Sequence, residues 1–254
     1  MCIMGPMFKK TLIVLSSLLG LVCPAYATPP AKVCVLVYHS FLGKPSLNRD
    51  VSLAELARQL DELKAKGYRF VSYADLEAGR VTGDHNILVS IDDGNLSVWK
   101  AYQQVFKPHG IRPLLGIYPA IIGKKSYALS WDQLRALSKA GCGIASHGYY
   151  HGKLDEAFYR QHPKEFSDEV RLSKQTLERE LGLRVTAFVC PYGVTSAPLI
   201  QQLRQAGYEA AFVLNWGPVL APLKLNPDPY RLGRYMYSDR NWAMLLGAIG
   251  QANR

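Results

Sequence analysis

The stretch NILVSIDDGNLSVW, residues 86–99, combines a buried strand, a charged turn and the start of a helix. The nearly continuous apolar run over 86–91 is typical of a strand that is covered on both faces. Asp92 and Asp93 follow it directly, and a helix is expected over 96–106. Two adjacent carboxylates repel each other unless positive charge lies nearby, so this strand end is the first candidate for a functional site.

The same alternation of apolar runs and helical patterns continues through the chain. Strands are expected over 33–38, 69–72, 86–91, 113–118, 142–146, 185–190, 210–214 and 230–236, and helices over 52–66, 74–78, 96–106, 130–141, 165–181, 197–206 and 241–249. Alternating strands and helices predict βα units and a parallel sheet. We therefore expect one α/β domain, an irregular (β/α)7-type barrel with its site at the C-terminal strand ends and a long loop over 148–164.

The N-terminus has the pattern of a secretory signal peptide. Lys9 and Lys10 precede a short apolar run over 11–23, and Ala25-Tyr26-Ala27 provides a small-residue cleavage site. We expect a signal peptide over 1–27, a domain over 28–254 and a periplasmic or secreted protein. An uncleaved anchor is the alternative, although the apolar run is short for a membrane span, and no stable span is expected after cleavage.

Charge and cysteine content limit the class of partner. The formal net charge is +10 at pH 7, which in a secreted protein favours polyanions, cell-wall polymers or membrane surfaces. No basic run is interleaved with aromatic residues, so nucleic acid is not an expected partner, and the oligomeric state is left open. Cys34, Cys142 and Cys190 are an odd number within 28–254, which excludes a complete disulfide framework.

Polar residues follow several of the expected strands. His147 and His151 lie four residues apart directly after a buried strand, so both rings can reach one ion on a helical turn. Such a pair alone often arises by chance on a surface. With one aspartate from the neighbouring strand end it forms a two-histidine, one-carboxylate site for a divalent metal. One of Asp92 and Asp93 can then bind the metal while the other stays free as a base.

These motifs together resemble the polysaccharide deacetylases of carbohydrate esterase family four, the NodB-homology domain. The resemblance runs from about residue 33 to 246. Its first motif matches Ser90-Ile91-Asp92-Asp93-Gly94, and its second matches His147-Gly148-Tyr149-Tyr150-His151. Further matches are Val37-Tyr38-His39, GYRFVSYADL over 67–76 and SWDQL over 130–134.

The resemblance implies a role for each matching residue. Asp92 matches the general base, and Asp93, His147 and His151 match the metal ligands. The backbone N–H of Tyr192 matches the donor that helps to hold the oxyanion. The implied cofactor is one divalent metal, for which zinc is expected and cobalt or nickel are the alternatives that also fit the ligand set. The implied products are acetate and a free amine.

The chain also departs from the family pattern. Val189 stands where the third motif has an arginine, which implies that the charge orienting the base is lost. No histidine follows His162, although the fifth motif provides one as the general acid. His39 is the candidate replacement, or else a histidine that only supports its neighbours. Asn215-Trp216 replaces an aspartate-containing fourth motif.

The third motif indicates a substrate class. Pro191-Tyr192-Gly193 without the arginine resembles the branch that deacetylates poly-β-1,6-N-acetylglucosamine, a biofilm polymer. We expect Pro191, Trp216 and Arg234 to contact this N-acetylated polysaccharide. Peptidoglycan or chitin oligomers are the alternative substrates, and a non-catalytic glycan-binding protein on the same fold is the alternative function. A glycoside hydrolase is disfavoured, because it needs two carboxylates on either side of a cleft.

Overall fold

A computed structural model describes Met1 and residues 30–44, 47, 49–238 and 241–252. The expected signal peptide and its cleavage site therefore lie outside the described residues, apart from Met1. The helices of the described part include none that is both long and apolar enough to cross a bilayer.

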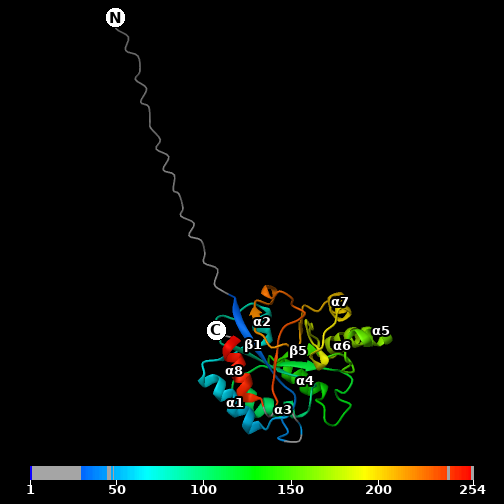
Figure 1. Ribbon diagram of the computed structural model, residues 1–254, viewed down its shortest axis with the longest axis horizontal. Coiled ribbons are helices and arrows are strands. Elements are labelled where there is room, and N and C mark those ends of the chain that lie inside the picture. The colour runs from blue at the N-terminus through cyan, green and yellow to red at the C-terminus, as the bar shows by residue number, and fades with distance from the viewer. Residues whose placement is uncertain (2–29, 45–46, 48, 239–240, 253–254) are drawn as a thin grey trace.

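A single sheet forms the centre of the molecule (Figure 1). Its strands are β1 (Ala31–Tyr38), β2 (Arg69–Phe70), β3 (Asn86–Ile91), β4 (Leu114–Ile117), β5 (Gly143–Ser146), β6 (Ala187–Val189), β7 (Ala210–Phe212), β8 (Val219–Ala221) and β9 (Tyr235–Met236). The order is β7-β6-β5-β4-β3-β1-β8, with β2 paired to β3 and β9 paired to β1. All pairs are parallel except β1 with β8, so the parallel α/β barrel expected from the sequence is confirmed in outline.

The segment before and within β9 brings the two ends of the curled sheet together. Leu232 exchanges backbone hydrogen bonds with β7, donating to the Ala211 carbonyl and accepting from Val213 N–H, each at 2.9 Å. A few residues later, Tyr235 and Met236 pair with β1. The expected strand over 230–236 is therefore a bridge between β7 and β1 in which only Tyr235–Met236 is regular strand.

Alternate strand residues form two separate apolar clusters. One includes Leu36, Val89 and Phe188 together with buried helix residues, so it lies between the sheet and the helices. The other includes Leu88 and Ala145, along with other inward positions on the strands, and fills the inside of the curl. Two residues of α2 join the inner cluster, so α2 covers the end of the barrel opposite the carboxyl ends of the strands.

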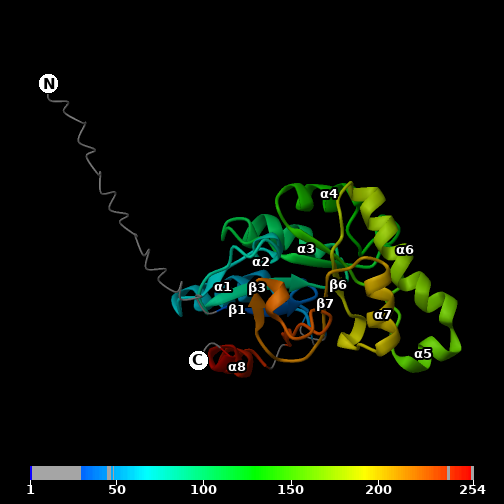
Figure 2. The same ribbon diagram turned by 90° about the horizontal axis from the view of Figure 1, so that it is seen from above.

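Helices surround the sheet. They are α1 (Leu53–Ala65), α2 (Tyr73–Glu77), α3 (Ser97–Ala101) continued by η1 (Tyr102–Phe106), α4 (Trp131–Lys139), α5 (Glu156–Gln161), α6 (Pro163–Leu181), α7 (Ala197–Gln205) and α8 (Trp242–Ala252), with short turns η2 (Pro191–Gly193) and η3 (Leu223–Leu225). Figure 2 shows α5, α6 and α7 at one end of the molecule and α1 and α8 at the other. Trp242 Nε1 donates to Glu62 at 2.8 Å and so joins α8 to α1.

Two elements were not expected from the sequence. Helix α5 lies within the expected loop over 148–164, and the side chain of Asp155 accepts a hydrogen bond from Phe158 N–H at its start. Strand β8 lies between Pro218 and Pro222, which made the segment resemble a loop. Proline is tolerated beside a strand at the edge of a sheet, and β8 occupies the edge next to β1.

Candidate metal centre and catalytic site

Asp92 projects from the end of β3 toward the inside of the barrel. Side chains alternate along a strand, so Leu88, Ser90 and Asp92 share the inner face. The Asp92 side chain is buried, and Gly116 on the next strand leaves room for it. A Cβ atom on Gly116 would lie 3.1 Å from Asp92 Oδ1 and 3.3 Å from the Cβ of Val189. Asp92 thus occupies a space that a larger residue at position 116 would reduce.

Arg234, in the segment that closes the barrel, supplies the positive partner of Asp92. Its Nη1 lies 2.9 Å and 3.0 Å from the two carboxylate oxygens, and 3.2 Å from the hydroxyl of Ser90. Burial alone would raise the pKa of Asp92, but the charge of Arg234, with His147 and His39 nearby, holds this pKa below its ordinary value. Asp92 is therefore an anion at neutral pH despite its burial.

This ion pair corrects one interpretation from the sequence. The charge that orients Asp92 is not lost with Val189, because Arg234 provides it from a segment 142 residues away in the chain. Arg234 has no exposed surface, so the structure assigns it to Asp92 and not to direct contact with substrate.

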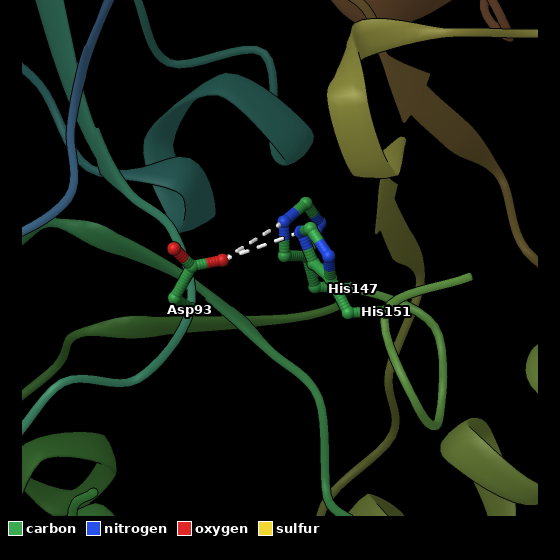
Figure 3. Close-up of side chains that lie close together, drawn as sticks. All are labelled: Asp93, His147 and His151. Carbon is green, nitrogen blue, oxygen red and sulfur yellow. Dashed lines mark ion pairs between the residues drawn. The ribbon is translucent and has the colours of Figure 1, made fainter. Parts of the chain in front are cut away.

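Asp93 turns away from Asp92 toward two histidines. Figure 3 shows one carboxylate oxygen of Asp93 facing both rings: Oδ1 lies 3.5 Å from His147 Nε2 and 3.4 Å from His151 Nε2. The three ligand atoms all lie within 4.8 Å of one another. The expected ligand set is therefore brought together by β3, β5 and the loop after β5.

The hydrogen bond of His147 fixes which ring nitrogen is available to a metal. Its Nδ1 lies 2.7 Å from the carbonyl oxygen of Val189, which can only accept a hydrogen bond. Nδ1 therefore carries a proton, and Nε2 is the nitrogen that faces Asp93 and His151. A ligating histidine commonly has its second nitrogen held in this way.

The donor set fits a divalent metal. Bonds of about 2.0–2.1 Å to a tetrahedral zinc place neighbouring ligand atoms about 3.4 Å apart, close to the two Asp93–histidine distances. Burial alone would raise the pKa of Asp93, but the hydrogen bond and charge of His147 lower it to about 2. Burial lowers the pKa of His151 to about 4. An anionic Asp93 and a neutral His151 are the forms that bind metal.

His39 follows β1 at the same rim. Its Nδ1 is buried, and among the described residues it has no hydrogen-bond partner. Burial lowers the pKa of His39 below its ordinary value of 6.5, although the charges of Asp92 and Asp93 act in the opposite direction. His39 directly follows Tyr38, whose carbonyl accepts a hydrogen bond from Asp92 N–H at 3.0 Å, and its part in proton transfer stays a prediction.

Tyr192 lies in the turn after β6, with its ring 4.8 Å from that of His151. Asp93, His151 and Tyr192 have φ values of 75°, 65° and 58°, and they are the non-glycine residues with positive φ in the described part of the chain. Such conformations cost about 1–3 kcal/mol each and tend to occur at functional sites. All three belong to the predicted site.

The expected substrate contacts differ in their exposure. Trp216 is 42% exposed, and its ring packs 5.6 Å from that of Tyr235. Tyr150, a tyrosine of the second motif, is a further exposed aromatic residue, at 67%. Both side chains present aromatic surface to solvent. Pro191 is buried and packs near Gly148, so it supports the loop more than it offers a surface to substrate.

One buried residue beside the site was missed from the sequence. Glu169 on α6 is 3% exposed and accepts hydrogen bonds from the loop that carries His151. The indication was its position: Phe166, Val170 and Ser173 share the buried face of the helix with Glu169. A carboxylate within such a face needs hydrogen-bond donors, so a glutamate at this position indicates that donors from another segment lie against the helix.

Comparison with known proteins agrees with this geometry. The family model described as polysaccharide deacetylase matches residues 79–211, a range that includes Asp92, Asp93, His147, His151 and Tyr192. A Bacillus subtilis (strain 168) protein named as polysaccharide deacetylase YxkH is 23% identical over 71% of this chain. The match spans 63% of the length of that relative.

Solved structures share the fold. IcaB from Ammonifex degensii is 26% identical, with a TM-score of 0.73 over 89% of this chain and 99% of that chain. The deacetylase PplD of Streptococcus pyogenes, solved with acetate, is 19% identical, with a TM-score of 0.73 over 87% of this chain and 99% of that chain. A de-N-acetylase from Aggregatibacter actinomycetemcomitans gives 19% identity and a TM-score of 0.69, over 85% and 99% of the two chains.

The Asp92–Arg234 pair generates a stability prediction. Arg234→Met leaves the buried carboxylate without its counter-charge, so we expect a loss of about 3–5 kcal/mol in the free energy of unfolding, measured with urea. Adding Asp92→Asn to this variant should restore part of the loss. Arg184→Met is the control, because the Arg184–Glu209 pair is exposed and should change little. Equal effects of the two arginine changes would contradict the assignment.

Proposed function

Because the chain belongs to the polysaccharide deacetylase family, we propose that it is a metal-dependent N-deacetylase of a polysaccharide containing N-acetylglucosamine. The observation that carries the proposal is that the Asp92–Arg234 pair and the cluster of Asp93, His147 and His151 lie at a single rim of the barrel. Asp92 has a buried arginine partner, and Asp93 has two histidines. A glycan-binding protein without catalysis would not need this separation of the two carboxylates.

Asp92 is the proposed general base. Held as an anion by Arg234, it accepts the proton of the attacking water. A divalent metal held by Asp93, His147 and His151 would supply Lewis-acid polarisation of the acetamide carbonyl and of the water.

The leaving amine needs a proton. His39 is the proposed donor, because the charges of both carboxylates act on it and no histidine follows His162 in the chain. Arg234 cannot take this role, since a guanidinium does not give up its proton at usable pH. The backbone N–H of Tyr192 is the proposed donor to the oxyanion, in a turn whose positive φ brings its ring against His151.

Poly-β-1,6-N-acetylglucosamine is the proposed substrate, with peptidoglycan or chitin oligomers as the alternatives. The support is the third motif, Pro191-Tyr192-Gly193, in which the position of the family arginine is Val189. Exposed aromatic surface at Trp216 and Tyr150 is suited to stacking against pyranose rings. We also propose export by the signal peptide over 1–27, followed by action in the periplasm or outside the cell.

Removal of the base should abolish the reaction without removing the metal site. We expect Asp92→Asn to lower acetate release from N-acetylglucosamine oligomers at least 100-fold, because general base catalysis contributes about 10²–10⁴-fold. Zinc should still bind, since its three ligands are intact. Asp132→Asn, at an exposed aspartate on α4, is the control. Full acetate release by the Asp92 variant would refute the mechanism.

The role of His39 predicts a pH dependence. The protonated ring gives its proton to the amine, and its pKa lies below 6.5, so kcat should fall as pH rises through that pKa. On the acid side, kcat should fall when Asp92 is protonated, below pH 3.8. His39→Gln should remove the upper limb of the profile, and His85→Gln, at an exposed histidine, should not. An unchanged limb in the His39 variant would exclude this donor.

A substrate panel tests the polymer class. We expect faster acetate release from poly-β-1,6-N-acetylglucosamine oligomers than from chitin oligomers when zinc, cobalt or nickel is added. Trp216→Ala should raise KM several-fold with little change in kcat, because stacking binds the sugar ring but does not enter the reaction. Equal rates on both oligomers would remove the support for linkage specificity.

A further inference from the structure

The two candidate histidines are held in different ways: His147 directly follows β5, whereas His151 lies in the loop Gly148–Gly152. His147 extends β5 by donating its N–H to the Ile117 carbonyl at 2.8 Å, and its ring is fixed by Val189. His151 lies beyond the turn, and apart from its approach to Asp93 no hydrogen bond holds its ring in the described part of the chain. The ring packs against those of Tyr118, His147 and Tyr192, so the position of His151 depends on these contacts and on the backbone of the loop.

The carboxylate of Glu169 accepts hydrogen bonds from three backbone N–H groups of that loop. Glu169 Oε2 accepts from Tyr149 N–H at 2.6 Å and from Tyr150 N–H at 2.9 Å, while Oε1 accepts from Gly152 N–H at 3.2 Å. Both oxygens are thus used, on residues before and after His151. Three N–H groups that converge on one buried anion fix the curvature of the loop.

The loop has glycine at the two positions closest to this carboxylate. A Cβ atom on Gly148 would lie 2.6 Å from Oε2, and one on Gly152 would lie 2.9 Å from Oε1. Both distances are too short for a normal contact. The loop therefore leaves space for the carboxylate in addition to offering it hydrogen bonds.

Hydrogen bonds from helix α6 to its neighbours fix the position of Glu169 relative to the loop. One turn further along the helix, the hydroxyl of Ser173 hydrogen-bonds that of Ser146, the last residue of β5. The Tyr208 hydroxyl also donates to the Val170 carbonyl at 3.2 Å. The carboxylate is thus tied to the strand that carries His147 and reaches the loop that carries His151.

We propose that Glu169 is a positioning residue for the metal centre, which sets the place of His151 through the backbone of the loop. The inference rests on the proposed function only in taking Asp93, His147 and His151 as metal ligands. Glu169 is not one of the three candidate ligands and acts through its hydrogen bonds to the loop backbone. Its effect is to hold His151 Nε2 within reach of Asp93 before a metal binds.

Zinc affinity of the metal-free protein tests this role. Glu169→Gln keeps the size of the side chain but replaces one acceptor oxygen by an amide that cannot accept, and we expect the dissociation constant for zinc to rise about 10–100-fold. Glu165→Gln makes the same change one turn away at an exposed position and should leave the constant unchanged. Competition with a chromophoric chelator gives both values.

A second variant keeps the carboxylate and displaces it. Gly152→Ala places a methyl group against Oε1 and should also raise the dissociation constant for zinc. If the Glu169 variant does not fold, the zinc affinity of Gly152→Ala tests the proposal. The absorption spectrum of the cobalt-loaded protein should change in both variants, because the ligand geometry changes. A role in folding alone would lower the melting temperature of the metal-free protein and leave zinc affinity and the cobalt spectrum as in the wild type.

The outcome is separate from that of the deacetylase assay. Weakened zinc binding in Glu169→Gln and Gly152→Ala supports the inference even if the wild-type protein releases no acetate from any polymer. Wild-type zinc affinity in these two variants, or an equal loss in Glu165→Gln, would overturn it whatever the activity.

Discussion

Two carboxylates adjacent in sequence at the end of one strand must each have a separate source of positive charge. Asp92 lies inside the barrel and takes its charge from Arg234, while Asp93 leaves the strand in a left-handed conformation and faces two histidines. Burial makes this separation necessary, because an unpaired ionised carboxylate in such a place is strongly unfavourable. The small residue at Gly116 and the closure of the barrel by Leu232 both serve to place the charges of Asp92 and Arg234 together.

The separation also divides the proposed chemistry. A carboxylate whose pKa is held low by a guanidinium stays ionised and free to accept a proton. A carboxylate that faces two imidazole nitrogens is placed to bind a cation. One short sequence, Asp92-Asp93, therefore provides two different functions because its two neighbours come from different parts of the barrel.

Much of this arrangement could be predicted from the sequence, and the reasons are local. The buried strand before Asp92 and the strand before His147 are recognisable from composition, and the C-terminal ends of parallel strands meet at one rim. Arg234 and Glu169 could not be assigned in the same way. Their partners are distant in sequence, and neither an arginine near a short strand nor a glutamate in a helix identifies its partner by spacing. Helix α5 and strand β8 were missed because each is short and lies in a segment rich in turn-forming residues.

The position of Arg234 has a consequence for the order in which the chain can fold. Asp92 and Arg234 are separated by 142 residues, and the segment that carries Arg234 is also the one that joins β7 to β1. A chain that has emerged only as far as β7 has its acidic strand but neither the closing segment nor the arginine. The site is therefore complete only when this closing segment is present, so a chain truncated before residue 232 would have an open sheet edge and an unpaired acid in its interior. The ion pair forms only when the closing segment has docked on both β7 and β1, so completion of the barrel and neutralisation of the buried acid occur together.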